Sequence, residues 1–252
     1  MLHTRVIPCL LLKGQGLVKT QKFKDPKYVG DPINAIKIFN DKEVDELVLL
    51  DIAASVEERG PNFKVIEEVA SECFMPLGYG GGISSLEQIR TIFSLGVEKV
   101  IINSWAFDQP ELVRAASDSF GSQSIVVSMD VKKNFFGKYE VHTRSASLNT
   151  KQDPVQYARE MEQRGAGEIL LTSVDRDGLM VGYDLQLLSK VAGAVNIPVI
   201  TCGGAGALFH FAEAVAHGAS ALAAGSMFVF QGKHRAVLIS YPDRAELERH
   251  LQ

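Results

Sequence analysis

The sequence is short of the residues that mark several protein classes. Its 252 residues contain three cysteines, Cys9, Cys73 and Cys202, with no CxxC pair. This speaks against a disulfide framework or a zinc site and favours a reducing compartment, here taken as the cytoplasm. The net charge is −4 and no long basic run occurs, so no nucleic-acid surface is indicated. The apolar N-terminal stretch is too short to span a membrane, and no small-residue cleavage site follows it. No metal or cofactor is expected.

The composition instead favours one large folded domain. Hydrophobic residues make up 46% of the chain and charged residues 22%, which excludes a mainly disordered chain. Short apolar runs, each about as long as a strand buried on both faces, lie at 6–12, 47–52, 75–79, 99–103, 124–130, 168–174, 197–201 and 221–225. Helical patterns separate them at 31–43, 62–73, 84–95, 109–119, 153–164, 184–194 and 207–217. This alternation predicts a single (β/α)₈ barrel over residues 1–252, with an open doubly wound sheet as the alternative.

The chain also repeats itself at an offset of 122 residues. The corresponding residues include Glu46 and Glu168, Pro76 and Pro198, Gly81-Gly82 and Gly203-Gly204, Gly96 and Gly218, and Ser104 and Ser226. A repeat of this length predicts two half-barrels, roughly 1–122 and 123–252. Whatever site the first half builds, the second half is expected to build opposite it.

Two glycine loops are the first functional candidates. Gly80–Gly82 follows the third expected strand, and Gly203-Gly204 with Gly206 follows the seventh. Glycine lets backbone N–H groups approach an anion closely, and a following helix N-terminus adds positive potential. Asn103-Ser104 and the turn Ala224-Gly225-Ser226 end the next strands and would complete each pocket. Tight turns without a ligand are the alternative, but two such loops favour a substrate with a phosphate at each end.

Acidic residues at the carboxyl ends of strands are the candidates for proton transfer. Asp51, Asp130, Asp175 and Asp177 lie there, where charged side chains of a barrel usually serve function. Asp130 is the strongest candidate. Aligning the first strand with the fifth places Leu11 opposite Asp130, so the second carboxylate of an acid/base pair is absent. Lys19, in the long loop after the first strand, either reaches the mouth as a cation or is solvated.

Charged residues also mark the opposite end of the barrel. Arg5, Glu46, Lys99 and Glu168 lie at or just before the starts of four strands. Two cations and two anions at one depth predict a salt-bridged ring across the floor. Such a ring is either a structural plug or part of a functional route, and the bottom face usually serves stability.

With these residues in place, the chain resembles the cyclase subunit of imidazole glycerol phosphate synthase over roughly residues 1–230. The resemblance rests on RVIPCL (5–10), GDPINA (30–35), DELVLLDI (45–52), YGGGI (79–83), FGSQSIVVSMD (120–130), GAGEILLTSVDRDG (165–178), GYDL (182–185), IPVITCGGAG (197–206) and ALAAGSMF (221–228). The family implies a glutaminase partner on the barrel floor. It also implies ammonia passing through the barrel to a bis-phosphorylated ribonucleotide, giving imidazole glycerol phosphate and an aminoimidazole carboxamide ribotide.

The resemblance assigns roles residue by residue. Asp130 matches one member of the family's acid/base pair, while Leu11 replaces the other. The phosphate-site residues of the family match Gly82, Asn103, Ser104, Asp177, Gly178, Gly203, Gly204, Ala224, Gly225 and Ser226. The loop lysine that clamps substrate matches Lys19. The salt-bridge gate of the ammonia route matches Arg5, Glu46, Lys99 and Glu168.

Leu11 and the segment after Phe230, QGKHRAVLISYP, depart from the family pattern. They resemble a paralogue group associated with surface-polysaccharide genes, in which the barrel and its glutaminase feed ammonia to a sugar-amidating enzyme. The leading hypothesis is therefore a cyclase subunit that uses channelled ammonia. The second is a largely non-catalytic conduit that supplies a sugar amidotransferase. A third is a sugar-phosphate isomerase of the same half-barrel symmetry, which would also need a second carboxylate.

Overall fold

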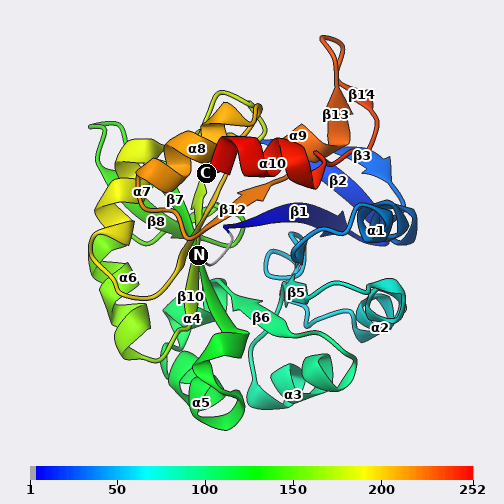
Figure 1. Ribbon diagram of the computed structural model, residues 1–252. Helices are drawn as coiled ribbons and strands as arrows, with labels where there is room; N and C mark the ends of the chain where they lie inside the picture. The colour runs from blue at the N-terminus through cyan, green and yellow to red at the C-terminus, as the bar shows by residue number, and fades with distance from the viewer. Residues whose placement is uncertain (1–3, 252) are drawn as a thin grey trace.

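The computed structural model describes residues 4–251, whose central strands close into an eight-stranded parallel barrel (Figure 1). The barrel strands are β1 (Arg5–Lys13), β4 (Leu47–Asp51), β5 (Leu77–Gly80), β6 (Lys99–Ile102), β7 (Ile125–Lys133), β10 (Glu168–Ser173), β11 (Val199–Cys202) and β12 (Ala221–Ala224). Each pairs in parallel with the next, and β12 pairs with β1. Closure confirms the predicted (β/α)₈ barrel and excludes the open sheet.

Helices connect the strands around the outside of the barrel. They are α1 (Pro32–Asp41), α2 (Phe63–Glu72), α3 (Leu86–Ser94), α4 (Ser104–Asp108), α5 (Glu111–Phe120), α6 (Pro154–Gln163), α7 (Leu185–Ala192), α8 (Phe209–Ala216) and α9 (Ser226–Val229), with a short 3₁₀ turn at Ser122–Ser124. Local chemistry explains several starts. The Asp153 carboxylate accepts hydrogen bonds from the amides of Val155 and Gln156, and Pro154 occupies the first helical position, where its fixed φ suits a helix.

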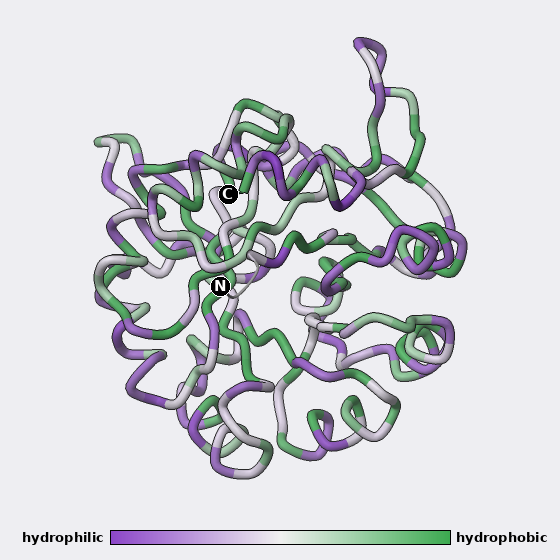
Figure 2. The backbone as a smooth tube through the Cα atoms, viewed as in Figure 1, coloured by the Kyte–Doolittle hydropathy of each residue, from purple (hydrophilic) through white to green (hydrophobic). Residues whose placement is uncertain are grey.

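Two apolar layers hold the barrel together. The larger core packs between the strands and the helices, and a smaller cluster fills the barrel interior. The interior cluster consists of Ile7, Cys9, Val48, Ile101, Val126, Leu170, Ile200, Cys202, Ala221 and Ala223. Strands apolar on both faces are what the short unbroken runs predicted. In Figure 2 the hydrophobic colours follow the strands, while hydrophobic and hydrophilic residues alternate along the outer helices.

Three hairpins project beyond the regular barrel and were not predicted as strands. They use β2 (Gly16–Gln21) and β3 (Lys24–Gly30), the end of β7 with β8 (Tyr139–Thr143), and β13 (Phe230–Gln231) with β14 (Ala236–Val237). A short strand β9 (Leu148–Asn149) extends β8. All three hairpins follow carboxyl ends of barrel strands, which is the catalytic face of such barrels. The expected long loop after the first strand is therefore the β2–β3 hairpin.

The segment after Phe230, which departs from the family pattern, has two parts. The β13–β14 hairpin stands away from the barrel, and the chain then returns to helix α10 (Arg244–Leu251), which packs against α8 (Figure 1). Tyr241 fixes the return, since its hydroxyl donates a 2.9 Å hydrogen bond to the carbonyl of Val6. Within residues 4–251, no helix has the length and apolar character to cross a bilayer.

Candidate active site

Two adjoining pockets open at the carboxyl ends of the barrel strands. The first pocket is lined largely by the first half of the chain, and the second largely by the second half together with β1 and β2. Four residues line both pockets: Leu50, Ile52, Asp130 and Ser145. The residues predicted to bind phosphate divide between them, with Gly82, Asn103 and Ser104 in the first, and Lys19, Asp177, Gly178, Gly203, Gly204, Ala224, Gly225 and Ser226 in the second. The two pockets thus form one elongated site with a shared centre.

The glycine loop of the first pocket needs its glycine for two reasons. Gly82 has a φ of +69°, and a Cβ there would lie 2.4 Å from the Arg59 carbonyl oxygen. The polar side chains of this pocket already have protein partners. Asn103 Nδ2 donates to the Asp130 carboxylate at 3.0 Å, and Ser104 Oγ accepts from the Arg144 amide at 3.1 Å. Asn103 therefore links the first pocket to the shared centre.

The second pocket contains a buried cation. The Lys19 side chain enters the mouth from β2, is 6% exposed, and donates from Nζ to the Cys9 carbonyl. Of the two alternatives for Lys19, the structure supports the one that reaches the mouth. Gly225 leaves the space that the ammonium occupies, because a Cβ there would lie 2.2 Å from Nζ. Thr20 Oγ1 donates to Asp177 at 2.9 Å and so fastens β2 to the turn after β10.

Asp130 lies where the two pockets meet. Its side chain is 7% exposed, and burial raises the pKa of its carboxyl to about 7, although the hydrogen bond from Asn103 opposes this and the charge of Asp177 adds to it. A carboxyl with a pKa near neutrality can both accept and return a proton. Burial also raises the pKa of the Asp177 carboxyl, which lines the second pocket.

Leu11 stands at the carboxyl end of β1, lines the second pocket and packs against the interior cluster. Its side chain cannot transfer a proton, so the partner of Asp130 in any acid/base pair must come from another position. Within the second pocket the titratable candidates are Lys19 and Asp177, since Cys9 and Cys202 belong to the apolar interior cluster. All three cysteines of the chain are free.

Two of the aspartates considered for proton transfer have structural partners instead. The Asp51 carboxylate accepts from the amides of Ala53 and Ala54 and from both ends of the Arg59 guanidinium, at 2.8 and 3.0 Å. Asp175 accepts from the Lys133 amide at 2.9 Å and lines neither pocket. These contacts hold loops in place, and they leave Asp130 and Asp177 as the carboxyls available to a ligand.

Ser145 was not anticipated from the sequence. It belongs to the turn 144–147 after β8, in which Arg144, Ser145 and Ala146 all have positive φ, and its hydroxyl donates to the Ile52 carbonyl at 2.7 Å. The turn therefore spans the mouth and lines both pockets. At the offset of 122 residues its counterpart is Phe23, which also lines the second pocket, but the two side chains share no chemistry that would mark the position in the sequence.

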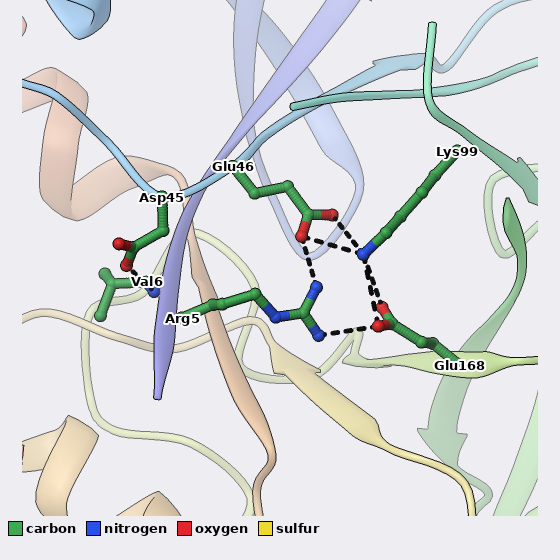
Figure 3. Close-up of polar contacts among 6 residues, drawn as sticks. All are labelled: Arg5, Val6, Asp45, Glu46, Lys99 and Glu168. Atoms are coloured by element: carbon green, nitrogen blue, oxygen red, sulfur yellow. Dashed lines mark hydrogen bonds and ion pairs between the residues drawn. The ribbon is translucent and has the colours of Figure 1, made fainter. Parts of the chain in front are cut away.

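The four charged residues at the floor form a closed ring (Figure 3). The Arg5 guanidinium contacts Glu46 through one nitrogen and Glu168 through the other, the latter at 2.8 Å. The Lys99 ammonium contacts the same two carboxylates at 3.0 and 3.2 Å. The structure thus brings together the residues predicted to form a ring, and each charge in the ring faces two of opposite sign. Within residues 4–251, no group of three or more histidine, cysteine or acidic residues is placed to hold a metal ion.

Fold and site together define a (β/α)₈ barrel with two facing pockets, one shared central carboxyl and an ion-paired floor. Residues 5–235 match the family described as "Histidine biosynthesis protein", and the chain belongs to this family. It is 55% identical over 249 residues, 98% of this chain and 99% of the relative, to "Putative imidazole glycerol phosphate synthase subunit hisF2" of Pseudomonas aeruginosa. It is 48% identical over 257 residues to "Putative imidazole glycerol phosphate synthase subunit hisF3" of Vibrio vulnificus, covering 100% and 98% of the two chains. It is 45% identical over 229 residues to the imidazole glycerol phosphate synthase subunit HisF of Alkaliphilus metalliredigens, covering 90% and 91%.

Proposed function

We propose that this chain is the cyclase subunit of a glutamine-dependent synthase, acting with ammonia supplied by a partner glutaminase. The substrate would be a bis-phosphorylated ribonucleotide, converted to imidazole glycerol phosphate and an aminoimidazole carboxamide ribotide. The observation that carries this proposal is the meeting of two glycine-built pockets at one buried carboxyl, Asp130. The relatives named as subunits of this synthase support it.

Each end of the site has its own part in this proposal. Positive-φ glycines expose backbone N–H groups in both pockets, and a phosphate in each would place the middle of the substrate beside Asp130. Lys19 adds a cation to the second pocket. Asp130, with a pKa of about 7, would move protons during ring closure, with Asp177 or Lys19 as the second group.

The ammonia route would run along the barrel axis. The floor ring of Arg5, Glu46, Lys99 and Glu168 would form the entrance, beneath a glutaminase docked on the floor. Above the ring lies the interior cluster, which is apolar and uncharged. Moving a charge through an apolar interior costs far more than moving a neutral molecule, so such a route would admit ammonia and exclude ammonium.

Leu11 favours a second candidate function. With an aliphatic side chain at the place opposite Asp130, the barrel would keep its pockets and route but lack a full acid/base pair. It would then be an ammonia-conducting scaffold for a sugar amidotransferase that makes acetamidino groups. In that case the ammonia would leave through the mouth rather than react in it.

Turnover of the bis-phosphorylated ribonucleotide separates the two. The purified chain is mixed with this substrate and an ammonium salt, without any partner, while calorimetry measures binding. Product formation supports the cyclase. Binding without turnover supports the conduit, and in that case Leu11→Asp should restore measurable turnover if the barrel is a decayed cyclase. If the substrate neither binds nor turns over, the proposal that the pockets hold it is overturned.

A further inference from the structure

The three hairpins on the catalytic face share one anchor. The turn after β10, Asp175–Gly178, is bonded to all of them. The Lys133 amide of the β7–β8 hairpin donates to Asp175 at 2.9 Å, and the Lys22 amide of the β2–β3 hairpin donates to the Asp177 carbonyl at 3.0 Å. Arg235 of the β13–β14 hairpin donates to the Gly178 carbonyl at 2.9 Å. The hairpins therefore stand around one turn at the rim of the second pocket, with the β7–β8 hairpin and the β13–β14 hairpin on opposite sides of the molecule (Figure 1). Together they form a three-hairpin surface around the barrel mouth.

Large apolar side chains are exposed on each hairpin. Phe135 and Phe136 at the tip of the β7–β8 hairpin are 97% and 89% exposed, and Tyr28 on β3 is 70% exposed. Val237 and Leu238 on the third hairpin are 50% and 60% exposed. Figure 2 shows this hairpin hydrophobic along its side and hydrophilic at its tip. Exposed apolar side chains are typical of protein interaction sites, and here they are spread over the three hairpins.

The same hairpins concentrate positive charge in a chain whose net charge is −4. Their exposed lysines are Lys22, Lys24, Lys27, Lys133, Lys138 and Lys233, against Asp25 and Glu140. Within residues 4–251, none of these six lysines is in a salt bridge. The Lys133 ammonium lies 4.8 Å from the centroid of the Tyr139 ring, and the charges of the other five lysines are available to a partner of opposite sign.

We propose that this three-hairpin surface is the docking site for a second protein seated over the barrel mouth, with an acidic surface that also offers apolar contacts to the hairpins. A second copy of this chain is disfavoured, because a two-fold contact would bring the same lysines face to face. A membrane is disfavoured by the pocket itself. Lys19, Asp130 and Asp177 line the pocket beside the hairpins, and a lipid surface would dehydrate them without offering polar partners. This docking proposal does not depend on which of the two candidate functions is correct.

Site-specific cross-linking tests this surface in the intact chain. A photoreactive benzoylphenylalanine replaces Phe136 in one variant and Glu68 in a control, and the cells that normally make the protein are irradiated. The Glu68 side chain is 56% exposed and lies midway along the outer helix α2, away from the hairpins. We expect a single protein cross-linked at position 136 and not at 68, and the captured protein is then purified for titration.

Titration with charge variants decides whether the contact is the one proposed. Lys24→Glu/Lys138→Glu should weaken binding of the captured protein by about tenfold at 0.15 M salt, from two lost attractions of about 0.7 kcal/mol each. The control Lys37→Glu/Lys64→Glu, on α1 and α2, should not change it. Ammonium-dependent turnover should be the same in all these variants, so loss of docking is distinguishable from failure of the proposed function.

Several outcomes would overturn the proposal. They are cross-linking at position 136 to phospholipid together with sedimentation on phosphatidylglycerol vesicles, cross-linking to a second copy of this chain, and no cross-link at all. Equal weakening of binding in the hairpin and control charge variants would overturn it too, because the charge effect would then be unspecific.

Discussion

Burial gives Asp130 a pKa of about 7 in place of the usual 3.8. The folded chain therefore keeps a proton that the unfolded chain releases between about pH 4 and pH 7. The contribution of this group to stability is most favourable below pH 4 and is lost as the pH rises through 7. The raised pKa corresponds to a penalty of up to about 4 kcal/mol at pH 8. Asp130 thus carries a stability cost at the pH where it can act as a base.

Asp130→Asn should separate these two effects. Asn103 can still donate to an amide oxygen, so the variant loses the charge and keeps the hydrogen bond. We expect urea unfolding at pH 8 to show the variant about 1–4 kcal/mol more stable than the parent, with the gain disappearing at pH 4.5. Any cyclase turnover should fall by about 10²- to 10⁴-fold. A gain of the same size at both pH values would show that the carboxyl is not buried as described.

Gly225 is expected to matter through Lys19. In Gly225→Ala the new Cβ would lie 2.2 Å from the Lys19 ammonium, so the lysine must leave the pocket. Loss of one charged hydrogen bond of about 1.5–3 kcal/mol should raise the Kd for the bis-phosphorylated substrate by about 10- to 100-fold. In a Lys19→Ala background the same glycine change should raise the Kd less, and what remains should come from the Cys9 carbonyl oxygen, which lies 2.9 Å from the new Cβ. Full additivity would mean that Gly225 acts independently of Lys19.

At the scale of elements, the loop after β4 is held by the Asp51–Arg59 pair. The Asp51 side chain is fully buried and Arg59 is 33% exposed. Arg59→Gln leaves a buried carboxylate without its cation. We expect the free energy of unfolding, measured with urea, to fall by about 3 kcal/mol. Arg164→Gln is the matched control, since its partner Glu111 is 75% exposed and the loss should be under about 1 kcal/mol. Equal losses would contradict the structural part given to Asp51.

The barrel strands could be predicted because their composition alone signals burial on both faces. Each of the eight apolar runs overlaps one of them. The hairpins could not be predicted in this way. Strands β13 and β14 have two residues each and pair only with each other, and β8 pairs with the end of β7 that projects beyond the barrel. The residues at each pocket followed from the repeat, but the meeting of the pockets at Asp130 did not. It depends on how far each side chain reaches across the mouth, which spacing along the chain does not specify. Ser145 could not be predicted either, because its counterpart in the repeat, Phe23, has a side chain of different chemistry.

At the scale of the whole molecule, the floor ring and the mouth lie at opposite ends of one barrel. If the ring is the ammonia entrance, Lys99→Ala should raise the ratio of glutamine hydrolysed to product formed in the complex with its glutaminase, by at least about twofold. Turnover with external ammonium should change little, because the mouth is untouched. Lys64→Ala on the outer helix α2, where Lys64 is 82% exposed, is the control. An unchanged ratio in Lys99→Ala would leave the ring as a structural plug.

The two pockets are related by the repeat, yet they are not interchangeable. At the offset of 122 residues, Asp177 and Thr172 of the second pocket correspond to Ser55 and Leu50 of the first. Lys19 lines the second pocket alone. A fully symmetric site would accept a two-ended molecule in either direction, and half of the bound molecules would face the wrong way. The unequal charges of the two ends give the site a polarity, so a ligand with different halves binds in one direction.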